Sequence, residues 1–479
     1  MNGILKKIRQ SDAFNRENRI PYIKAVLLMS LFTFSFLGTE FLFVNMISQT
    51  AIAGRTVAAQ NYALGISVVG FVLYPLLCRL CRGKLQAVIS AVAAVLSAVF
   101  IFLICRHTSY ASTLCLGLAV FLIFGAFGSA VYCKSLCLLE NNTHVARLVG
   151  ISYMLGTVLQ FANNNLIHNE YAEAGILSAF ILLLAVMLIR AEKNSVVPAL
   201  AKDSTEDDAG KSAADSLRIG IVLAVFVALM TCIFSTLDNA VTLYHANGVV
   251  NIGQWPRMIL ALSGLSAGFL YDIAERKYMS IIMYCVMILS TACLVVLQFA
   301  GPFVIGLIIF YLSAGFFSVF FTASFMEIAR YTKVPELWVG LGRAVNNLIA
   351  VAITGGSLAL LNSGNNIAII SIELLLFVLA SIAALIYTNK RKAFFDRLAA
   401  EQESEAGDSE KLQRLAEKFS LTPREAEVFG LLVNTEDGLQ SIADRLYVSR
   451  RTLERYVSAI YEKTGSKSRI GLVTLYNNA

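Results

Sequence analysis

The chain contains 479 residues, of which 57% are hydrophobic and 15% charged, with a mean hydropathy of +0.68 and a formal net charge of +7. Soluble globular proteins average about 45–50% apolar and about 25% charged residues. The composition therefore excludes a disordered chain, a small disulfide-stapled domain and an ordinary water-soluble enzyme, and it favours a membrane protein.

Twelve apolar blocks follow one another along most of the chain. A helix needs about 20 mostly apolar residues to cross about 30 Å of hydrocarbon, and each block is long enough. The blocks lie at 22–48, 58–77, 86–105, 111–133, 147–167, 172–190, 217–244, 252–273, 278–298, 302–326, 338–361 and 366–388. Residues 191–216 form the longest and most polar connection, so we expect a cytoplasmic linker there between two six-helix halves, 22–190 and 217–388.

Basic residues predict the orientation of this array. The N-terminal segment, 1–21, is rich in Lys and Arg, and so are the connections after the even-numbered blocks. Lys390, Arg391 and Lys392 follow the last block. We therefore expect a multi-pass protein of the inner, cytoplasmic membrane with both ends in the cytoplasm. The first block lacks the short core and cleavage site of a removable signal peptide.

Two features carry a resemblance to the major facilitator superfamily of transporters. One is the six-plus-six array with a polar central linker. The other is the loop Gly268-Phe-Leu-Tyr-Asp272-Ile-Ala-Glu-Arg276-Lys277, which matches the superfamily's G-x-L-x-D-x-x-x-R-[KR] pattern. The equivalent loop between blocks two and three, 75–84, keeps Arg82 and Lys84 but lacks the Gly and the Asp. The resemblance implies an all-helical transmembrane bundle whose loop helps to gate the cytoplasmic side.

Polar side chains inside membrane spans are costly and mark functional sites by default. Blocks one, five, seven, eight and eleven carry them, and in the superfamily these helices can line a cavity between the halves. We expect a small-molecule cavity, mostly in the outer half of the bilayer, lined by Glu40, Gln160, Asn163, Asn164, Asp238, Asn239, Arg257, Arg343 and Asn346. The alternative is that these residues bond one another and hold helices together.

Catalytic and metal-binding patterns are not found in the sequence. The nine cysteines are scattered through apolar blocks, and the Cys78-x-x-Cys81 pair lacks the second ligand pair of a zinc site, so packing is the favoured interpretation. The four histidines show no metal spacing, and no phosphate-binding or nucleophile motif occurs. We expect no enzyme, no cofactor and no bound metal.

Residues 389–418 predict a cytoplasmic linker. It begins with basic residues suited to anionic lipid heads and continues with an acidic stretch around Gly407, where we expect a flexible joint. A helix-compatible run, 410–418, leads into the remaining residues.

Residues 419–479 predict four short helices. Thr422 and Glu425 form a capping box at the start of the first helix. Tyr447, Val448 and Ser449 make a tight turn between the second and third helices, Ser449 caps the third and Gly465 ends it. A three-residue turn between two helices is typical of a helix-turn-helix domain.

The amino-acid sequence of this segment resembles the LuxR-type, or FixJ-type, DNA-binding domain of bacterial response regulators. The resemblance rests on LTPREAEV at 421–428, IADRL at 442–446 and VSRRTLERYVSAIYEKTG at 448–465. It implies that the third helix meets double-stranded DNA through Ser449, Arg450, Arg451, Thr452, Glu454, Arg455 and Ser458. Glu454 and Tyr456 depart from the usual Lys and His of the family, and Glu can accept from cytosine N4. The alternative is a solvated face on which Arg451 and Glu454 simply pair.

Residues 410–479 carry a net charge of only +2, so a single copy should bind DNA weakly. The family commonly dimerises through its last helix, which would align two domains on paired half-sites. RNA polymerase is a further candidate partner. The primary hypothesis is a membrane-embedded transcriptional regulator in which a small molecule bound to the transporter-like body controls the DNA-binding tail. The alternatives are a transporter that also senses its substrate, and a transporter with a vestigial tail.

Overall fold

The computed structural model describes residues 16–81, 83–139, 144–191, 206–274, 276–298 and 303–478. The chain divides into two compact units, Met1–Arg391 and Lys392–Ala479. In the described residues every regular element is a helix. The first unit, called the body below, holds α2 to α12 and the first half of α13. The second unit, called the tail, holds the second half of α13 and α14 to α17.

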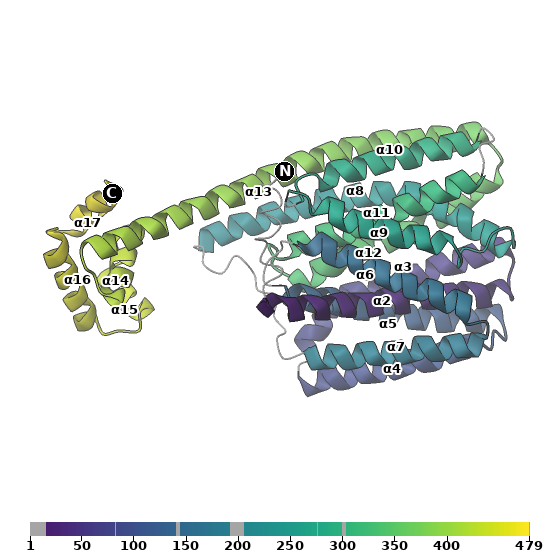
Figure 1. Cartoon of the computed structure of the whole chain (residues 1–479), viewed down its shortest axis with the longest axis horizontal. Helices are drawn as coiled ribbons and strands as arrows, with labels where there is room; N and C mark the ends of the chain where they lie inside the picture. The colour runs from purple at the N-terminus through teal and green to yellow at the C-terminus, as the bar shows by residue number, and fades with distance from the viewer. Residues whose placement is uncertain are drawn as a thin grey trace. The chain divides into compact units, whose positions relative to one another are not determined.

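Each of the twelve apolar blocks forms a helix of the body, and these helices lie side by side along one general direction (Figure 1). Their bounds are α2 Arg16–Ser48, α3 Ala53–Leu80, α4 Lys84–Ile104, α5 Tyr110–Cys137, α6 Val145–Leu166, α7 Glu170–Arg190, α8 Glu206–Ala246, α9 Pro256–Tyr271, α10 Met279–Gln298, α11 Phe303–Ala329, α12 Pro335–Asn362 and α13 Asn366–Lys418. By length and composition, ten helices of the described chain can cross a membrane. The other two are α9, with 16 residues, and α10, whose apolar part is Met279–Ala292.

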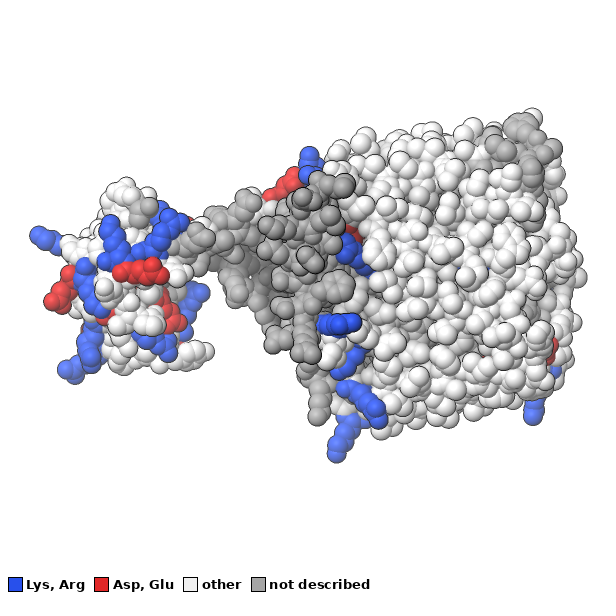
Figure 2. Space-filling model, in the orientation of Figure 1, with Lys and Arg blue, Asp and Glu red and all other residues white. Residues whose placement is uncertain are grey.

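The outer surface of the body is apolar. Val88, Val92 and Val95 of α4 are 57%, 52% and 53% exposed, and Figure 2 shows a broad face of the body without charged side chains between its ends. Such a large exposed apolar surface is unstable in water and stable against lipid. The helices of the body are therefore membrane helices.

Small residues let these helices approach closely, as is common in membrane bundles. A Cβ atom at Gly70 of α3 would lie 2.1 Å from the Leu122 carbonyl oxygen of α5. Gly150 of α6 and Gly268 of α9 face one another in the same way, because a Cβ on Gly150 would lie 2.6 Å from the Gly268 Cα. The glycine of the loop pattern thus permits close packing between a helix of the first half and one of the second.

Three helices differ from the prediction, two in where they begin and one in being unbroken. Helix α8 begins at Glu206, so the second part of the expected 191–216 linker is helical, while 192–205 lies outside the described residues. Helix α13 runs without a break through Gly407, which contradicts the flexible joint expected there. A helix tolerates an isolated glycine at a cost of about 1 kcal/mol, and many good helix formers surround this one. Helix α2 begins at Arg16, inside the expected N-terminal segment.

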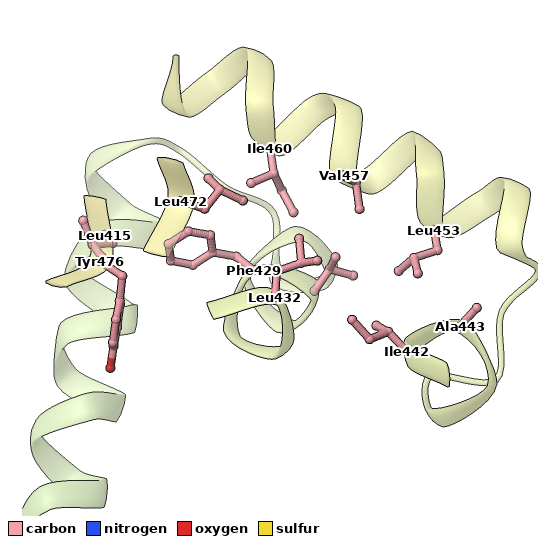
Figure 3. Close-up of a cluster of buried hydrophobic side chains, with 11 residues drawn as sticks. Leu415, Phe429, Leu432, Ile442, Ala443, Leu453, Val457, Ile460, Leu472 and Tyr476 are labelled. Atoms are coloured by element: carbon pink, nitrogen blue, oxygen red, sulfur yellow. The ribbon is translucent and has the colours of Figure 1, made fainter. Parts of the chain in front are cut away.

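The tail is built around its own apolar core. Its four helices are α14 Pro423–Asn434, α15 Leu439–Arg445, α16 Arg450–Thr464 and α17 Arg469–Asn477. Leu453, Val457 and Ile460 of α16 point toward Phe429 and Leu432 of α14 (Figure 3). Phe429 and Leu453 are fully buried.

The end of α13 belongs to this core, although the sequence placed it in the linker. Leu415 is buried in the core cluster, and the Tyr476 hydroxyl of α17 donates to Asp408 Oδ1 at 2.7 Å. Burial first, and then this carboxylate, raise the pKa of Tyr476 to about 12. The last turns of α13 therefore pack as a fifth helix of the tail.

Candidate functional site

Helix α16 is held by local signals at both ends. Ser449 caps it, accepting from the Thr452 backbone N–H at 3.1 Å. Gly465 ends it with φ 69°, in the left-handed region that favours glycine. The predicted N-cap and C-cap are confirmed, and the turn before α16 spans 446–449, one residue more than predicted.

The outward face of α16 collects the residues expected to meet DNA. Leu453, Val457 and Ile460 occupy the opposite, buried face. Thr452 is half-buried, and the remaining candidates are exposed, namely Ser449, Arg450, Arg451, Glu454, Arg455 and Ser458.

The charges on this face are paired differently from the expected pattern. Arg450 Nε donates to Glu454 Oε1 at 3.1 Å, four residues along the helix, so the partner of Glu454 is Arg450 and not Arg451. Residues four apart stack on one side of a helix. Among the described residues, Arg451 and Arg455 make no hydrogen bond or ion pair, and their guanidinium groups point to solvent. Free guanidinium groups suit guanine O6/N7 or phosphate.

A hydrogen bond from Lys463 braces α16 against the capping box at the start of α14. The expected capping box is present, because Glu425 N–H donates to Thr422 Oγ1 and Thr422 N–H donates to Glu425 Oε2. Lys463, in the last turn of α16, donates to the same carboxylate. The Lys463 hydrogen bond, followed by the Thr422 backbone N–H, lowers the pKa of Glu425.

The body contains a polar cavity of about 150 Å³. Five of the nine residues expected in a ligand cavity line it, and they come from α2, α8, α9 and α12: Glu40, Asp238, Arg257, Arg343 and Asn346. Aromatic rings make up much of the remaining wall, including Phe36, Phe234, Phe317 and Phe321.

The charged groups of the cavity have few protein partners. Gln60 Nε2 donates to Glu40 Oε1 at 2.7 Å. The Arg343 guanidinium lies 5.8 Å from the Phe36 ring centre and 5.0 Å from that of Phe321, within cation–π range. Arg257 Nε is buried and has no hydrogen-bond partner in the described part of the chain.

The other four expected residues do not line the cavity. Gln160 Nε2 donates to the Leu37 carbonyl oxygen of α2, and Asn163 Nδ2 donates to Glu173 Oε1 of α7. The alternative drawn from the sequence, that intramembrane amides hold helices together, describes both contacts.

Asn239 and Asn164 do not line the cavity either, and they differ in their hydrogen bonds. Asn239 accepts from Asn61 Nδ2 at 2.8 Å and donates to Ser357 Oγ at 2.6 Å, so it joins α8 to α3 and α12. The amide atoms of Asn164 are buried and without a partner among the described residues.

Sequence reasoning missed several polar residues of the cavity wall. Gln60 and Asn61 of α3 line it, as do Tyr153 of α6 and Tyr311 of α11. The signal for Gln60 and Asn61 was present, because they are intramembrane amides in the second block. The two tyrosines lie within apolar blocks, and nothing in the sequence distinguishes them from ordinary residues of a membrane helix.

A second polar cluster lies at the end of the body that carries the loop pattern. Arg276 of the loop donates to Glu327 Oε1 of α11 at 2.7 Å, and Arg391 of α13 donates to both oxygens of the same carboxylate at 2.9 Å. Asp272 of the loop accepts from the Arg147 backbone N–H at 2.8 Å, in the first turn of α6. The loop thus joins α6 of the first half to α11 and α13 of the second. Arg82 of the degraded loop lies outside the described residues.

The tail has the arrangement of a DNA-binding helix-turn-helix domain, with α15, a short turn over 446–449 and an exposed, charged α16. Residues 419–476 match the family model of GerE, the bacterial regulatory proteins of the luxR family. The tail is a LuxR-type DNA-binding domain. No curated protein matches the chain.

Solved transporters of the major facilitator superfamily match the body. The E. coli fucose:proton symporter FucP matches with a TM-score of 0.52 and 14% identity over 78% of this chain and 99% of that one. FucP in the outward conformation gives 0.53 and 13% over 78% and 99%, and an auto-inhibited POT family peptide transporter gives 0.51 and 13% over 78% and 96%. These identities establish a shared fold. The chain therefore joins a major-facilitator-like membrane body to a LuxR-type DNA-binding domain.

Proposed function

We propose that this protein is a membrane-embedded transcriptional regulator in which a small molecule bound in the body's cavity controls DNA binding by the tail. The observation that carries the proposal is that α13 belongs to both the body and the tail. The same helix is anchored in the body through Arg391 and supplies Leu415 to the core of the DNA-binding domain.

The loop cluster supports a route from the cavity to α13. A ligand can shift a conformational equilibrium only through its different affinity for the two states. Movement of one six-helix half against the other would disturb the contact between Asp272 and α6. Arg276 follows Asp272 in the loop and shares the Glu327 carboxylate with Arg391, so the change would reach α13.

The proposal places twelve spans in two sets of six, with both ends of the chain in the cytoplasm. Twelve helices in the body and the Lys and Arg residues at one of its ends support it (Figure 2). A cytoplasmic tail has access to DNA, and α16 then enters the major groove. Arg451 and Arg455 are the free cations on its outward face.

Dimerisation through α17 completes the proposal. Leu472 and Tyr476 of α17 face the core, whereas Ile470, Thr474 and Asn477 are exposed along one side of the helix. Ile470 is 78% exposed. An exposed isoleucine in a stripe of mixed polarity suits a small symmetric contact, and two domains on paired half-sites would offset the low charge of one.

A reporter gene under the promoter of the protein's own locus tests the proposal in the full-length chain. Arg455→Ala should bring reporter output to the level of a strain without the protein, whereas Lys467→Ala, an exposed cation outside α16, should leave it unchanged. Arg391→Gln should alter output while Lys392→Gln, its exposed neighbour, does not. Unchanged output in Arg455→Ala would overturn the DNA-binding role.

A transporting sensor is the second candidate, because the body has a transporter fold. Uptake of labelled sugars, peptides and amino acids into proteoliposomes separates the two. Accumulation above that of protein-free vesicles would assign transport to the body, and a reporter that still responds would keep the regulatory role.

A further inference from the structure

The cavity of the body holds two basic and two acidic side chains that form no ion pair with one another in the described part of the chain. Glu40 and Asp238 face Arg257 and Arg343 round the same space. Among the described residues no ion pair joins these four groups, and the hydrogen bond from Gln60 to Glu40 is their only one. From this arrangement we infer that the cavity binds a small zwitterion of the amino-acid type. The inference rests on the proposed function and names the class of its ligand.

The electrostatic argument starts from the cost of burying charge. An ion removed from water without a partner is strongly destabilised, and the penalty is reduced only by an opposite charge and by hydrogen bonds. Two basic and two acidic groups balance one another in formal charge, but no direct hydrogen bond joins a guanidinium group to a carboxyl group among the described residues. A ligand that carries an ammonium and a carboxylate supplies the missing partner to both.

The positions of the groups suit the two ends of such a ligand. Phe36, against which Arg343 stacks, precedes Glu40 by four residues on α2, so both side chains are on one face about 6 Å apart along the axis. A carboxylate can therefore reach Arg343 while the neighbouring ammonium lies at the level of Glu40. Asp238, from α8, lines the same space.

The remaining wall specifies the rest of the ligand. Phe234, Phe317 and Phe321 contribute rings, and two of these rings, Phe234 and Phe317, stack with centres 4.6 Å apart. A cavity of about 150 Å³ is of the size that holds a six-membered carbon ring. The side chain of the zwitterion is therefore small and apolar or aromatic. A neutral sugar would give neither the two guanidinium groups nor the two carboxyl groups a partner of opposite charge. A simple anion would give such a partner to the guanidinium groups alone.

The full-length protein in lipid nanodiscs tests this inference by its thermal unfolding, because a ligand that binds the folded state raises the midpoint. The probes are the twenty standard amino acids, fucose, and, for each amino acid that stabilises, the amine without its carboxylate and the acid without its ammonium. We expect at least one apolar or aromatic amino acid to stabilise the protein. Removing either head group should weaken binding by about tenfold to about 100-fold.

The variants assign each end of the ligand. Arg343→Gln should abolish the preference for the zwitterion over its amine, and Glu40→Gln the preference over its acid. Arg55→Gln, an exposed arginine at the start of α3, is the matched control and should behave as the parent. An unfolding midpoint without ligand that equals the parent's shows that the body of each variant is folded.

Three results would overturn the inference: no stabilisation by any amino acid, equal stabilisation by the one-headed analogues, or stabilisation by fucose alone. These results leave the proposed function standing if the reporter still depends on Arg455. If the unmutated protein does not control the reporter, the proposed function is overturned, whatever binds in the cavity.

Discussion

The tail and the body place their polar side chains on opposite sides of their helices. In α16 the apolar residues Leu453, Val457 and Ile460 turn inward and the charges turn to water. In the body, Val88 and Val92 turn outward, whereas Glu40 and Asp238 line an internal cavity. The difference follows from the solvent, since water rewards an exposed charge and hydrocarbon penalises it.

The comparison teaches where a mutation should act in each region. In the tail, we expect core residues to control stability and surface residues to control DNA binding, so the two effects should be separable. In the body, the polar residues are buried and also define the proposed ligand and coupling sites. We expect stability and function to be coupled there.

The strongest test of this coupling is Glu327→Gln. The change removes the carboxylate that Arg276 and Arg391 share, and the loss of one partner from a buried ion pair costs about 3–5 kcal/mol. Unfolding of the full-length protein in nanodiscs should occur at lower temperature, and reporter control should weaken with it. Glu336→Gln, at the half-buried start of α12, is the matched control. A stable variant with normal reporter control would break the comparison.

Leu453→Ala tests the core of the tail. Leu453 is fully buried in α16, and truncation of such a leucine costs about 2–5 kcal/mol. The free energy of unfolding of a fragment containing residues 392–479, measured with urea, should fall by this amount. Ile470→Ala, at an exposed apolar position of α17, should leave it nearly unchanged. Equal losses at both positions would contradict the assignment of inner and outer faces.

Glu425→Gln sharpens the comparison through pH. The contact with Lys463 lowers the pKa of Glu425 in the folded tail, so the carboxylate stabilises the fold above its unfolded pKa of about 4.3. This contribution is lost as the pH falls through the lower, folded pKa. At pH 7 the variant should lose about 0.5–1.5 kcal/mol, because Gln can keep the capping hydrogen bond but loses the charge that faces Lys463. Urea titrations of the 392–479 fragment between pH 7 and pH 3 should show the gap to the parent closing.

The smallest effect is expected for the Arg450–Glu454 pair on the exposed face of α16. An exposed pair four residues apart contributes only about 0.3–0.5 kcal/mol to stability. Glu454→Ala should therefore leave the unfolding free energy within this margin. The same change should alter base preference, measured by selection from a random duplex library. An unchanged preference would remove Glu454 from the base-reading positions.

The fold of the tail could be predicted almost entirely from its sequence. Thr422 with Glu425, Ser449 and Gly465 are local signals that act on the backbone within a few residues. Apolar spacing then selects the inner face. The participation of Leu415 was not visible, because the acidic stretch before it suggested a linker and Tyr476, its neighbour in the core, lies far along the chain.

The cavity was predicted less completely, for a geometric reason. Composition predicts that Asp238 and Asn239 avoid lipid, but adjacent residues point about 100° apart on a helix. Asp238 therefore faces the cavity, while Asn239 contacts Asn61 and Ser357. Which neighbour each direction meets depends on the packing of all the helices.

The sequence by itself determined the membrane character of the body, the positions of its helices and the DNA-binding class of the tail, because hydrophobic length, caps and motifs act locally. The tertiary structure alone decided which polar residues share one cavity, that Arg276 and Arg391 meet at Glu327, and that α13 is one helix through Gly407. These are contacts between segments distant in the chain, and no local pattern encodes the direction in which neighbouring helices pack.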